Sequence, residues 1–354
     1  MFKPHFDWLI VLPSLLLLII SLTIIRSVSP QLFSIQLSFI IISIIIFFII
    51  SSLDYQIIYS FHLPAYLILL IITLSLPFMG ILSRGATRWI QIGNFTLQPS
   101  EILKPFLLLT LSYFSTHLSS LRGLWLFIFG LIPILIVFFQ PDLGTSIVLF
   151  IGWASLVLSQ VNLKSLIIFV LTAILFSVPF YQFALKDYQR QRLITFVNPY
   201  SDPLGQGYHV IQSVIAVGSG GIIGRGLGHG TQTQLRFLPE HHTDFIFSSI
   251  SEELGFIGSL ITILLYSILL FRIFRISQDS LDPKTAQFSI ACLAMLSFQI
   301  LINISMNLGL APVTGITLPL MSYGGSSLLS TAILLGIISS ISKTTKPTGV
   351  MVIH

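Results

Sequence analysis

Long apolar runs recur from one end of the 354-residue chain to the other, separated mostly by short polar turns. A helix needs about 20 residues to cross a bilayer, and roughly ten of the runs approach or exceed that length. The predicted membrane-spanning helices cover residues 8–25, 32–53, 63–82, 101–116, 124–139, 143–161, 164–184, 244–270, 285–308 and 314–341. The pattern therefore predicts an all-α polytopic membrane protein of about ten transmembrane helices, forming one domain over residues 1–354.

Composition supports this class. Hydrophobic residues make up 54% of the chain and charged residues only 8%, whereas a soluble domain has about 25% charged residues. The net charge of +5 does not indicate a nucleic-acid partner, because no basic cluster is interleaved with aromatic residues. The single cysteine, Cys292, lies inside a predicted span, so neither a disulfide framework nor a cysteine metal site is expected.

The distribution of basic residues predicts the orientation, since cytoplasmic loops of membrane proteins carry an excess of Lys and Arg. With a cytoplasmic N-terminus, the inner side carries Lys3, Arg122, Lys164, Arg272, Arg275, Lys284, Lys343 and Lys346. The short outer loops then carry Arg26, Arg84, Arg88 and Lys104. Both termini are therefore predicted to be cytoplasmic, and the long connection of residues 185–243, between the seventh and eighth spans, to be extracytoplasmic.

This connection does not have the composition of a disordered linker. Its apolar stretch from Val210 to Val217, ended by "GSGG", predicts a helix at or dipping into the membrane interface. The following "GSGGIIGRGLGHG" permits two interpretations, a turn-rich loop or a cradle whose backbone N–H groups hold a phosphate. No Walker spacing supports the second interpretation, although Arg225 and Arg236 flank the glycines.

The eighth predicted span opens with "HTDFIFSSISEELGFIG", so a carboxylate stands at the start of a membrane-like helix. On a continuous helix, small and polar residues fall within about 40° of one line. This stripe comprises Asp244, Ser248, Ser251, Gly255 and Gly258. It should face a polar cavity or a closely packed neighbour, because ionised groups are costly in hydrocarbon. Glu252 and Glu253 are expected deeper in the span, in structural roles.

Asp244 itself permits two compatible interpretations. Thr243 or Asp244 is placed to cap the helix by accepting hydrogen bonds from its first free N–H groups. The positive end of the helix dipole would also keep Asp244 ionised, and an ionised carboxylate can act as a base. The adjacent His241 and His242 lack the spacing of a zinc site, while a transient divalent ion at Asp244 stays open.

Further polar residues stand at the outer ends of other spans. Glu101 and Lys104 in "QPSEILKP" are one helical turn apart, which suits an ion pair. Asp142 in "QPDLGT" has two interpretations, a hairpin turn or a functional carboxylate. The segment "LPLMSYGGSS", residues 318–327, places Pro and paired Gly in the tenth span. Its start is therefore predicted to be bent or unwound, which a membrane protein tolerates where backbone lines a cavity.

Five of these segments together resemble one family. They are "GATRWIQIGNFTLQPSEILK" (85–104), "QPDLGTS" (140–146), "FVNPYSDPLGQGYHVIQSVIAVGSGGIIGRGLGHGTQTQ" (196–234), "FLPEHHTDFIFSSISEELGFIG" (237–258) and "NLGLAPVTGITLPLMSYGGSS" (307–327). In this order they are similar to the SEDS proteins of shape, elongation, division and sporulation. The segment "GTQTQLRFLPE" resembles the elongation branch more than the division branch. His209 departs from the family's common "GYQ".

The resemblance implies a peptidoglycan glycosyltransferase that polymerises lipid II at the outer face of the cell membrane. It assigns the catalytic carboxylate to Asp244 and motif positions to Glu101, Lys104 and Asp142. Candidate contacts to the substrate, including its pyrophosphate, are Glu101, Lys104, Asp142, Arg225, Arg236 and Ser248. No metal-binding residue is expected, and a divalent cation, Mg or Mn, is the one cofactor left open.

The resemblance also implies partners. These are lipid II, membrane lipid, the elongation machinery and a class B penicillin-binding protein, a transpeptidase with a single span. Two other functions stay open: a flippase for lipid II, and a scaffold for the transpeptidase. A flippase should carry polar groups through the whole bilayer depth, and a scaffold has no need of the polar stripe.

Overall fold

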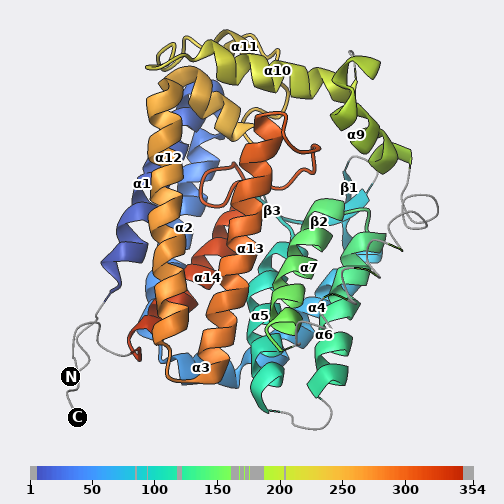
Figure 1. Cartoon of the computed structure of the whole chain (residues 1–354), viewed down its shortest axis with the longest axis vertical. Helices are drawn as coiled ribbons and strands as arrows, with labels where there is room; N and C mark the ends of the chain where they lie inside the picture. The colour runs from blue at the N-terminus through green and yellow to red at the C-terminus, as the bar shows by residue number, and fades with distance from the viewer. Residues whose placement is uncertain are drawn as a thin grey trace.

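The computed structural model describes residues 6–83, 86–93, 95–117, 122–160, 187–202 and 205–345, together with residues 167, 171 and 175. Most of this chain forms an upright helix bundle (Figure 1). The long helices are α1 (Trp8–Val28), α2 (Phe33–Ser52), α4 (His62–Met79), α5 (Pro99–His117), α6 (Arg122–Phe139), α7 (Leu143–Leu158), α12 (Ile246–Asp279), α13 (Pro283–Asn307) and α14 (Gly325–Ser342). A short helix α3 (Tyr55–Ser60) and a 3-10 turn η1 (Pro30–Leu32) connect α1, α2 and α4.

The helices of the bundle match the predicted spans. Six of the described helices are long and apolar enough to cross a membrane, and two shorter apolar helices, residues 123–139 and 143–158, accompany them. The seventh predicted span, residues 164–184, lies almost entirely outside the described residues. The tenth span begins later than predicted, because α14 starts only at Gly325 and residues 311–324 are not helical. The prediction of an unwound start to this span is confirmed.

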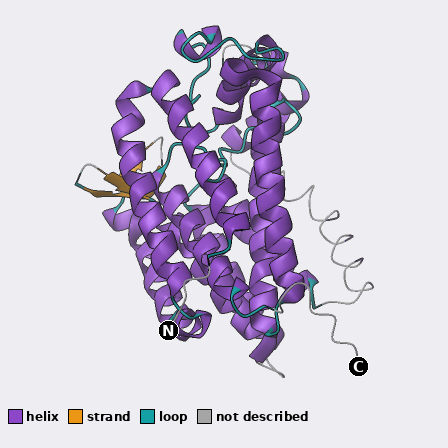
Figure 2. Cartoon of the chain, turned by 90° about the vertical axis from the view of Figure 1, so that its left-hand side faces the viewer, coloured by secondary structure: helices purple, strands orange, loops and turns teal. Residues whose placement is uncertain are grey.

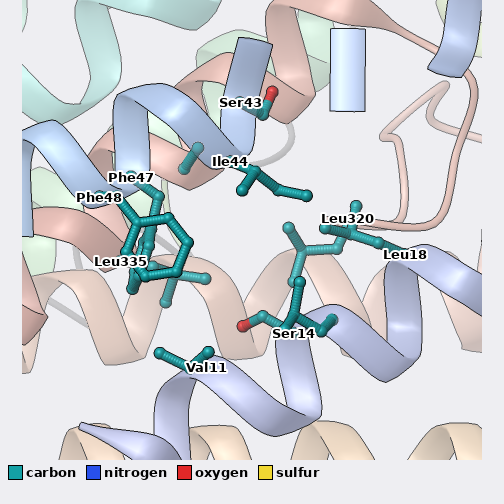
Figure 3. Close-up of a pocket in the computed structure, with 11 residues that line it drawn as sticks. Val11, Ser14, Leu18, Ser43, Ile44, Phe47, Phe48, Leu320 and Leu335 are labelled. Carbon is teal, nitrogen blue, oxygen red and sulfur yellow. The ribbon is translucent and has the colours of Figure 1, made fainter. Parts of the chain in front are cut away.

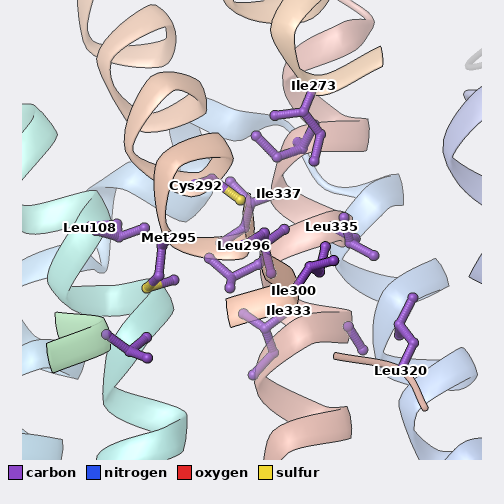
Figure 4. Close-up of a cluster of buried hydrophobic side chains, with 14 of the residues drawn as sticks. Leu108, Ile273, Cys292, Met295, Leu296, Ile300, Leu320, Ile333, Leu335 and Ile337 are labelled. Atoms are coloured by element: carbon purple, nitrogen blue, oxygen red, sulfur yellow. The ribbon is translucent and has the colours of Figure 1, made fainter. Parts of the chain in front are cut away.

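The core of the bundle lies around α14. This helix is buried along nearly its whole length, whereas only about a quarter of the residues of α2 and α4 are buried. Figure 4 shows Leu296 and Ile300 of α13 beside Ile333 and Ile337 of α14. Small residues allow such close approach: a Cβ at Gly336 would lie only 3.1 Å from the side chain of Ile50. Helices in a membrane associate through this kind of van der Waals packing, since lipid is as apolar as the side chains.

A small apolar cavity lies between α1, α2 and α14, with a volume of about 40 Å³ (Figure 3). Val11, Phe47, Leu320 and Leu335 are among its lining residues. Its lining is almost entirely apolar, with Ser14 and Ser43 as the only hydroxyl-bearing residues among the described lining side chains.

A three-stranded antiparallel sheet was not predicted. It consists of β1 (Ile81–Ser83), β2 (Ala86–Ile92) and β3 (Phe95–Leu97) and projects from one side of the bundle (Figure 2). The third predicted span ran to residue 82, but α4 ends at Met79. The β-branched and aromatic residues of "TRWIQI" are the strand signal, whereas the apolar content alone does not indicate a strand.

The predicted extracytoplasmic connection is largely helical. It contains α9 (Asp187–Val197), a 3-10 turn η3 (Pro199–Ser201), α10 (Gln206–Ser219) and α11 (Thr231–Gln234). α9, α10 and α11 lie across one end of the bundle, opposite α3 (Figure 1). The helix predicted around Val210–Val217 is confirmed as α10, whose burial of Val210 and Ala216 places it on the bundle.

Candidate active site

Asp244 lies just before α12, where its main chain is fixed by α13. The side-chain nitrogens of Asn303 and Asn307 both donate hydrogen bonds to the Asp244 carbonyl oxygen, at 3.1 and 3.0 Å. Asn303 also donates to the carbonyl oxygen of Ile316, at 2.7 Å. The two asparagines, one helical turn apart on α13, therefore hold Asp244 and the segment 311–324 together. We call them the asparagine bracket.

The predicted cap at Thr243 or Asp244 is wrong. The residue in the cap position is Phe245, which offers no side-chain hydrogen bond. Instead Oδ1 of Asn307 accepts from the backbone N–H of Ser248 at 3.0 Å and from its hydroxyl at 2.7 Å. A neighbouring helix thus supplies the acceptor that a capping side chain normally provides. The carboxylate of Asp244 is not needed as the cap.

Ser248 is fully buried, and its hydroxyl also lies 2.7 Å from that of Ser213 on α10. Ser213 donates to the carbonyl oxygen of Asn307 at 2.8 Å. Ser248, one residue of the predicted stripe, thus faces closely packed neighbours, one of the two surroundings expected for the stripe. The position of Ser248 favours a structural role for its hydroxyl, and its contact with substrate stays a prediction.

We expect Asn303→Ala to slow catalysis about tenfold by loosening Asp244. The variant leaves the buried carbonyl groups of Asp244 and Ile316 with one donor fewer, which should cost ~1–3 kcal/mol of stability. Initial rates and thermal unfolding of the variant test both effects. Ser289→Ala is the matched control, because its hydroxyl bonds only within α13. An equally slowed Ser289→Ala, or an unslowed Asn303→Ala, would remove the bracket from the positioning of Asp244.

The segment 311–324 lies beside Asp244. A Cβ at Gly315 would lie 3.7 Å from Oδ2 of Asp244, and a Cβ at Gly144 would lie 2.9 Å from the carbonyl oxygen of Thr314. On the other side, the hydroxyl of Ser322 donates to the carbonyl oxygen of Thr243 at 2.7 Å. Residues 314–316 therefore lie between Asp244 and the start of α7. The unwound segment therefore contacts the residues just before α12, the start of α7 and, through Asn303, helix α13.

Asp142 stands in the turn between α6 and α7, as its hairpin interpretation predicted, and it also caps α7. It accepts from the backbone N–H of Thr145 at 3.1 Å, from the Thr145 hydroxyl at 3.0 Å, and from the side-chain amide of Gln98 at 2.6 Å. Arg88 of β2 lies 3.9 Å from the same carboxylate and donates to the carbonyl oxygens of Gln140 and Pro141. The sheet and the α6–α7 turn are thereby fixed to each other. A direct role of Asp142 toward substrate stays a prediction.

Glu101 and Lys104 form the predicted ion pair at the start of α5. Their charged atoms are 2.6 Å apart, and the side chains are 10% and 3% exposed. A pair this buried is costly unless it is well matched. The charge of Lys104 is therefore largely offset by Glu101 before any substrate arrives.

α12 is not continuous, and this corrects the prediction of one straight span. Gly255 has φ 68° and ψ −162°, a conformation essentially limited to glycine. The hydroxyls of Ser251 and Ser259 are 2.8 Å apart, whereas eight residues of straight helix separate backbone positions by about 12 Å. The chain thus reverses direction at Gly255. Residues 246–254 run toward the end of the bundle that carries α10 and α11, and the rest of α12 runs away from that end.

The glycine-rich loop satisfies the backbone groups freed by this break. Phe256 and Ile257 donate to the carbonyl oxygens of Gly221 and Ile222, at 2.9 and 3.1 Å. In return the carbonyl oxygens of residues 252 and 253 accept from the N–H groups of residues 225 and 226, at 2.9 and 3.0 Å. We call this four-bond contact the backbone latch. It gives the glycines a structural purpose, in agreement with the interpretation of the segment as a loop.

Two buried carboxylates strengthen the latch. Glu252 accepts from the backbone N–H groups of Gln232 and Thr233, at 2.8 and 3.1 Å. Glu253 accepts from the hydroxyl of Ser27 on α1, at 2.6 Å, and from Gly228 N–H, at 3.2 Å. Their predicted structural role is supported, but their predicted depth is wrong, because the break returns them to the end of the bundle that carries α10 and α11.

Arg225 and Arg236 lie on the surface of this end. Both side chains are exposed, and Nε of Arg225 donates to the carbonyl oxygen of Ser219 at 3.2 Å. Arg236 has a positive φ of 58° and follows α11 directly. Their exposure distinguishes these arginines from Lys104, which is buried against Glu101. Their contact with a substrate pyrophosphate stays a prediction.

His209 of α10 lies against the start of α12, with its ring centroid 6.4 Å from that of Phe245. Burial lowers the pKa of His209 below its ordinary value of 6.5; Glu240 and Asp202 oppose this shift, and Arg192 adds to it. The neutral imidazole is therefore favoured in the folded protein.

Acid should consequently destabilise the protein through His209. Because its pKa is lower in the folded than in the unfolded chain, the unfolded chain binds more protons below about pH 6.5, and this part of the stability is lost as the pH falls. We expect His209→Gln to lose less thermal stability between pH 7.5 and 5.5 than the wild type. His229→Gln, which replaces an exposed histidine, is the control. Equal losses in all three proteins would rule out His209 as the source.

No group of three or more His, Cys, Asp or Glu side chains placed to hold a metal ion is found in the described part of the chain. Both ring nitrogens of the neighbouring His241 have hydrogen-bond partners within the protein. Its Nδ1 lies 2.8 Å from the Leu238 carbonyl oxygen, and its Nε2 lies 3.1 Å from the Ser29 hydroxyl. A divalent cation at Asp244 stays a prediction.

These features define a polytopic membrane protein with a carboxylate held at one end of its bundle. A family model described as a cell cycle protein, covering FtsW, RodA and SpoVE, matches residues 5–347. The chain belongs to this family.

Individual relatives agree along most of the chain. Peptidoglycan glycosyltransferase MrdB of Escherichia coli K12 is 37% identical over 347 residues, covering 96% of this chain and 94% of its own. Stage V sporulation protein E of Bacillus subtilis is 36% identical over 372 residues, covering 96% and 98%. A structure described as showing structural coordination of polymerization and crosslinking by a peptidoglycan synthase complex superposes with a TM-score of 0.82, at 30% identity, covering 96% and 98%.

Proposed function

We propose that this protein is a peptidoglycan glycosyltransferase that polymerises lipid II, with Asp244 as the general base. The observation that carries the assignment of the base is the fixed placement of Asp244. The asparagine bracket holds its main chain, Phe245 and not Asp244 stands in the cap position of α12, and a Cβ at Gly315 would lie 3.7 Å from Oδ2. The full-length similarity to MrdB, named a peptidoglycan glycosyltransferase, supports the reaction.

The chemistry needs only one such carboxylate. Asp244 takes the proton of the acceptor sugar's 4-hydroxyl while that oxygen forms a bond to the anomeric carbon of the donor. The bond from this carbon to the pyrophosphate oxygen breaks, and the lipid pyrophosphate leaves with the electron pair. Pyrophosphate leaves without protonation, unlike the sugar alkoxide of glycoside hydrolysis, which needs a second, acidic carboxyl group. Inversion at an α-linked donor produces a β-1,4 glycan.

The leaving pyrophosphate calls for positive charge. Lys104 is the first candidate, although its charge is already paired with Glu101 at 2.6 Å. Arg225 and Arg236 follow, on the exposed surface beyond the latch, and a divalent cation would serve the same purpose. Charge compensation thus comes from the Glu101–Lys104 pair, from an exposed arginine drawn toward Asp244, or from a divalent cation bound with the substrate.

The proposed orientation in the membrane follows from the distribution of Lys and Arg along the chain. Asp244 works at the outer face of the cell membrane, with both termini in the cytoplasm and residues 185–243 outside. The proposed partner is a class B penicillin-binding protein of the elongation machinery. Similarity to a chain from a complex described as coordinating polymerization and crosslinking supports this pairing. A division-type role, as in FtsW, is the alternative for the biological process.

Reconstitution of the wild-type protein with its partner transpeptidase in liposomes tests the proposal. Fluorescent lipid II is supplied on the outside, and glycan chains are resolved by gel electrophoresis while transfer between leaflets is followed by quenching. We expect polymer, and no faster transfer than in empty liposomes. Transfer without polymer would establish a flippase instead. Neither polymer nor transfer, in a protein that binds the transpeptidase, would leave a scaffold.

A further inference from the structure

A groove lies between α1 and α12 at the end of the bundle opposite Asp244. Its volume is about 540 Å³. One face of α12 supplies most of its lining, because the residues recur every three to four positions along the helix. The lining comprises Leu9 of α1 and Leu264, Ser267, Ile268, Phe271, Arg272 and Arg275 of α12.

The groove combines an apolar floor with two guanidinium groups at one end. Leu9, Leu264 and Phe271 are 56%, 52% and 63% exposed, so the floor is open to the hydrocarbon of a surrounding bilayer. Arg272 and Arg275 come eight and eleven residues after Leu264, about 12 and 17 Å further along the helix. This order, acyl-sized apolar surface followed by positive charge, matches the order of chains and phosphate in a phospholipid.

The two arginines differ in how their charge is used. Nε of Arg272 forms an ion pair with Oδ2 of Asp7 at 2.7 Å, which ties the start of α1 to α12. Arg275 is exposed, and its guanidinium carbon lies 5.9 Å from the centroid of the Phe271 ring. None of the ion pairs among the described residues includes Arg275. One positive charge of the groove is therefore available to a ligand.

We propose that this groove binds an anionic phospholipid, with the phosphate at Arg275 and an acyl chain along Leu264 and Ile268. Basic pockets between transmembrane helices on the cytoplasmic side are suited to acidic headgroups. The predicted orientation places this end in the cytoplasmic leaflet. The lipid would bridge α1 and α12, the helix that continues from the catalytic segment.

Native mass spectrometry of the purified full-length protein tests this site. The protein is offered equal amounts of dioleoylphosphatidylglycerol and dioleoylphosphatidylcholine, and a parallel sample receives inorganic phosphate. We expect preferential retention of phosphatidylglycerol, reduced about fivefold by Arg275→Gln. Ile268→Trp, which fills the groove without a change of charge, should reduce retention of both lipids.

Arg26→Gln is the matched control, since it removes the same charge from the last turn of α1 at the other end of the bundle. Equal retention of the two lipids by the wild type would overturn the proposal, as would unchanged retention in Arg275→Gln. A response to inorganic phosphate without preference for phosphatidylglycerol would also contradict it, because a free-anion site would then explain the charge. Failure of Ile268→Trp to reduce retention would exclude the groove as the place of the acyl chain.

Discussion

Asp244→Asn should form glycan chains at least ~10³-fold more slowly than the wild type, the upper range of what a general base contributes. The amide preserves the size of the side chain but does not accept the proton of the attacking hydroxyl. Folding should be unaffected, because the asparagine bracket contacts the carbonyl oxygen of residue 244 and not its carboxylate. Initial rates with lipid II and the partner transpeptidase measure the effect.

Asp279→Asn is the matched control for this substitution. It removes a carboxylate from the far end of α12, so any effect of net charge alone should appear in both variants. A slow Asp279→Asn would show that the loss does not belong to Asp244. A fully active Asp244→Asn would leave the residue with a structural role only.

Gly255→Ala should destabilise the protein by ~3 kcal/mol or more and abolish activity. Its φ of 68° and ψ of −162° strain any residue with a side chain. A Cβ would also lie 2.2 Å from the backbone nitrogen of Gly224 and 2.6 Å from the carbonyl oxygen of Ile222. Neither atom can move without opening the backbone latch, so residues 246–254 and the adjoining Asp244 would lose their support. Thermal unfolding and initial rates test the expectation.

Gly218→Ala serves as the control, because nothing lies within 4 Å of the corresponding Cβ. It stands within α10, where alanine is more favourable than glycine, so its stability should equal or exceed that of the wild type. If Gly255→Ala is as stable as Gly218→Ala, the break in α12 is not held by the latch.

Structural features could be predicted from the sequence where their physical cause lies within one short segment of the chain. Glu101 and Lys104, one turn apart, predicted an ion pair that the structure contains. Pro319 and the paired glycines within residues 318–327 predicted a bent or unwound start to the last span, and the unwound start is confirmed. In both cases the physical cause lies within about one helical turn of the chain.

The break at Gly255 could not be predicted in this way, because it depends on two distant segments. A lone glycine in an apolar helix is tolerated. A break in a helix leaves backbone N–H and C=O groups without their helical partners. At Gly255 these groups are satisfied by the loop at residues 221–226, about thirty positions earlier in the chain. The error in the depth of Glu252 and Glu253 follows from the same cause.

The asparagine bracket had a signal that was overlooked. Asn303 and Asn307 stand four residues apart in a predicted span, so they share one face of α13. Polar side chains in such a span usually bond to a neighbouring helix. The sequence therefore indicated a polar contact on this face, but not that the partner was the main chain of Asp244.

The most direct test of Asp244 as the base separates binding from turnover. Lipid II binding and glycan formation are measured together on Asp244→Asn and wild-type protein, each in complex with the transpeptidase. We expect binding within about twofold of the wild type and glycan formation at least ~10³-fold slower, since the base acts in the transition state and not in substrate capture. Polymer formed at the wild-type rate by a folded Asp244→Asn protein would contradict the assignment of the base.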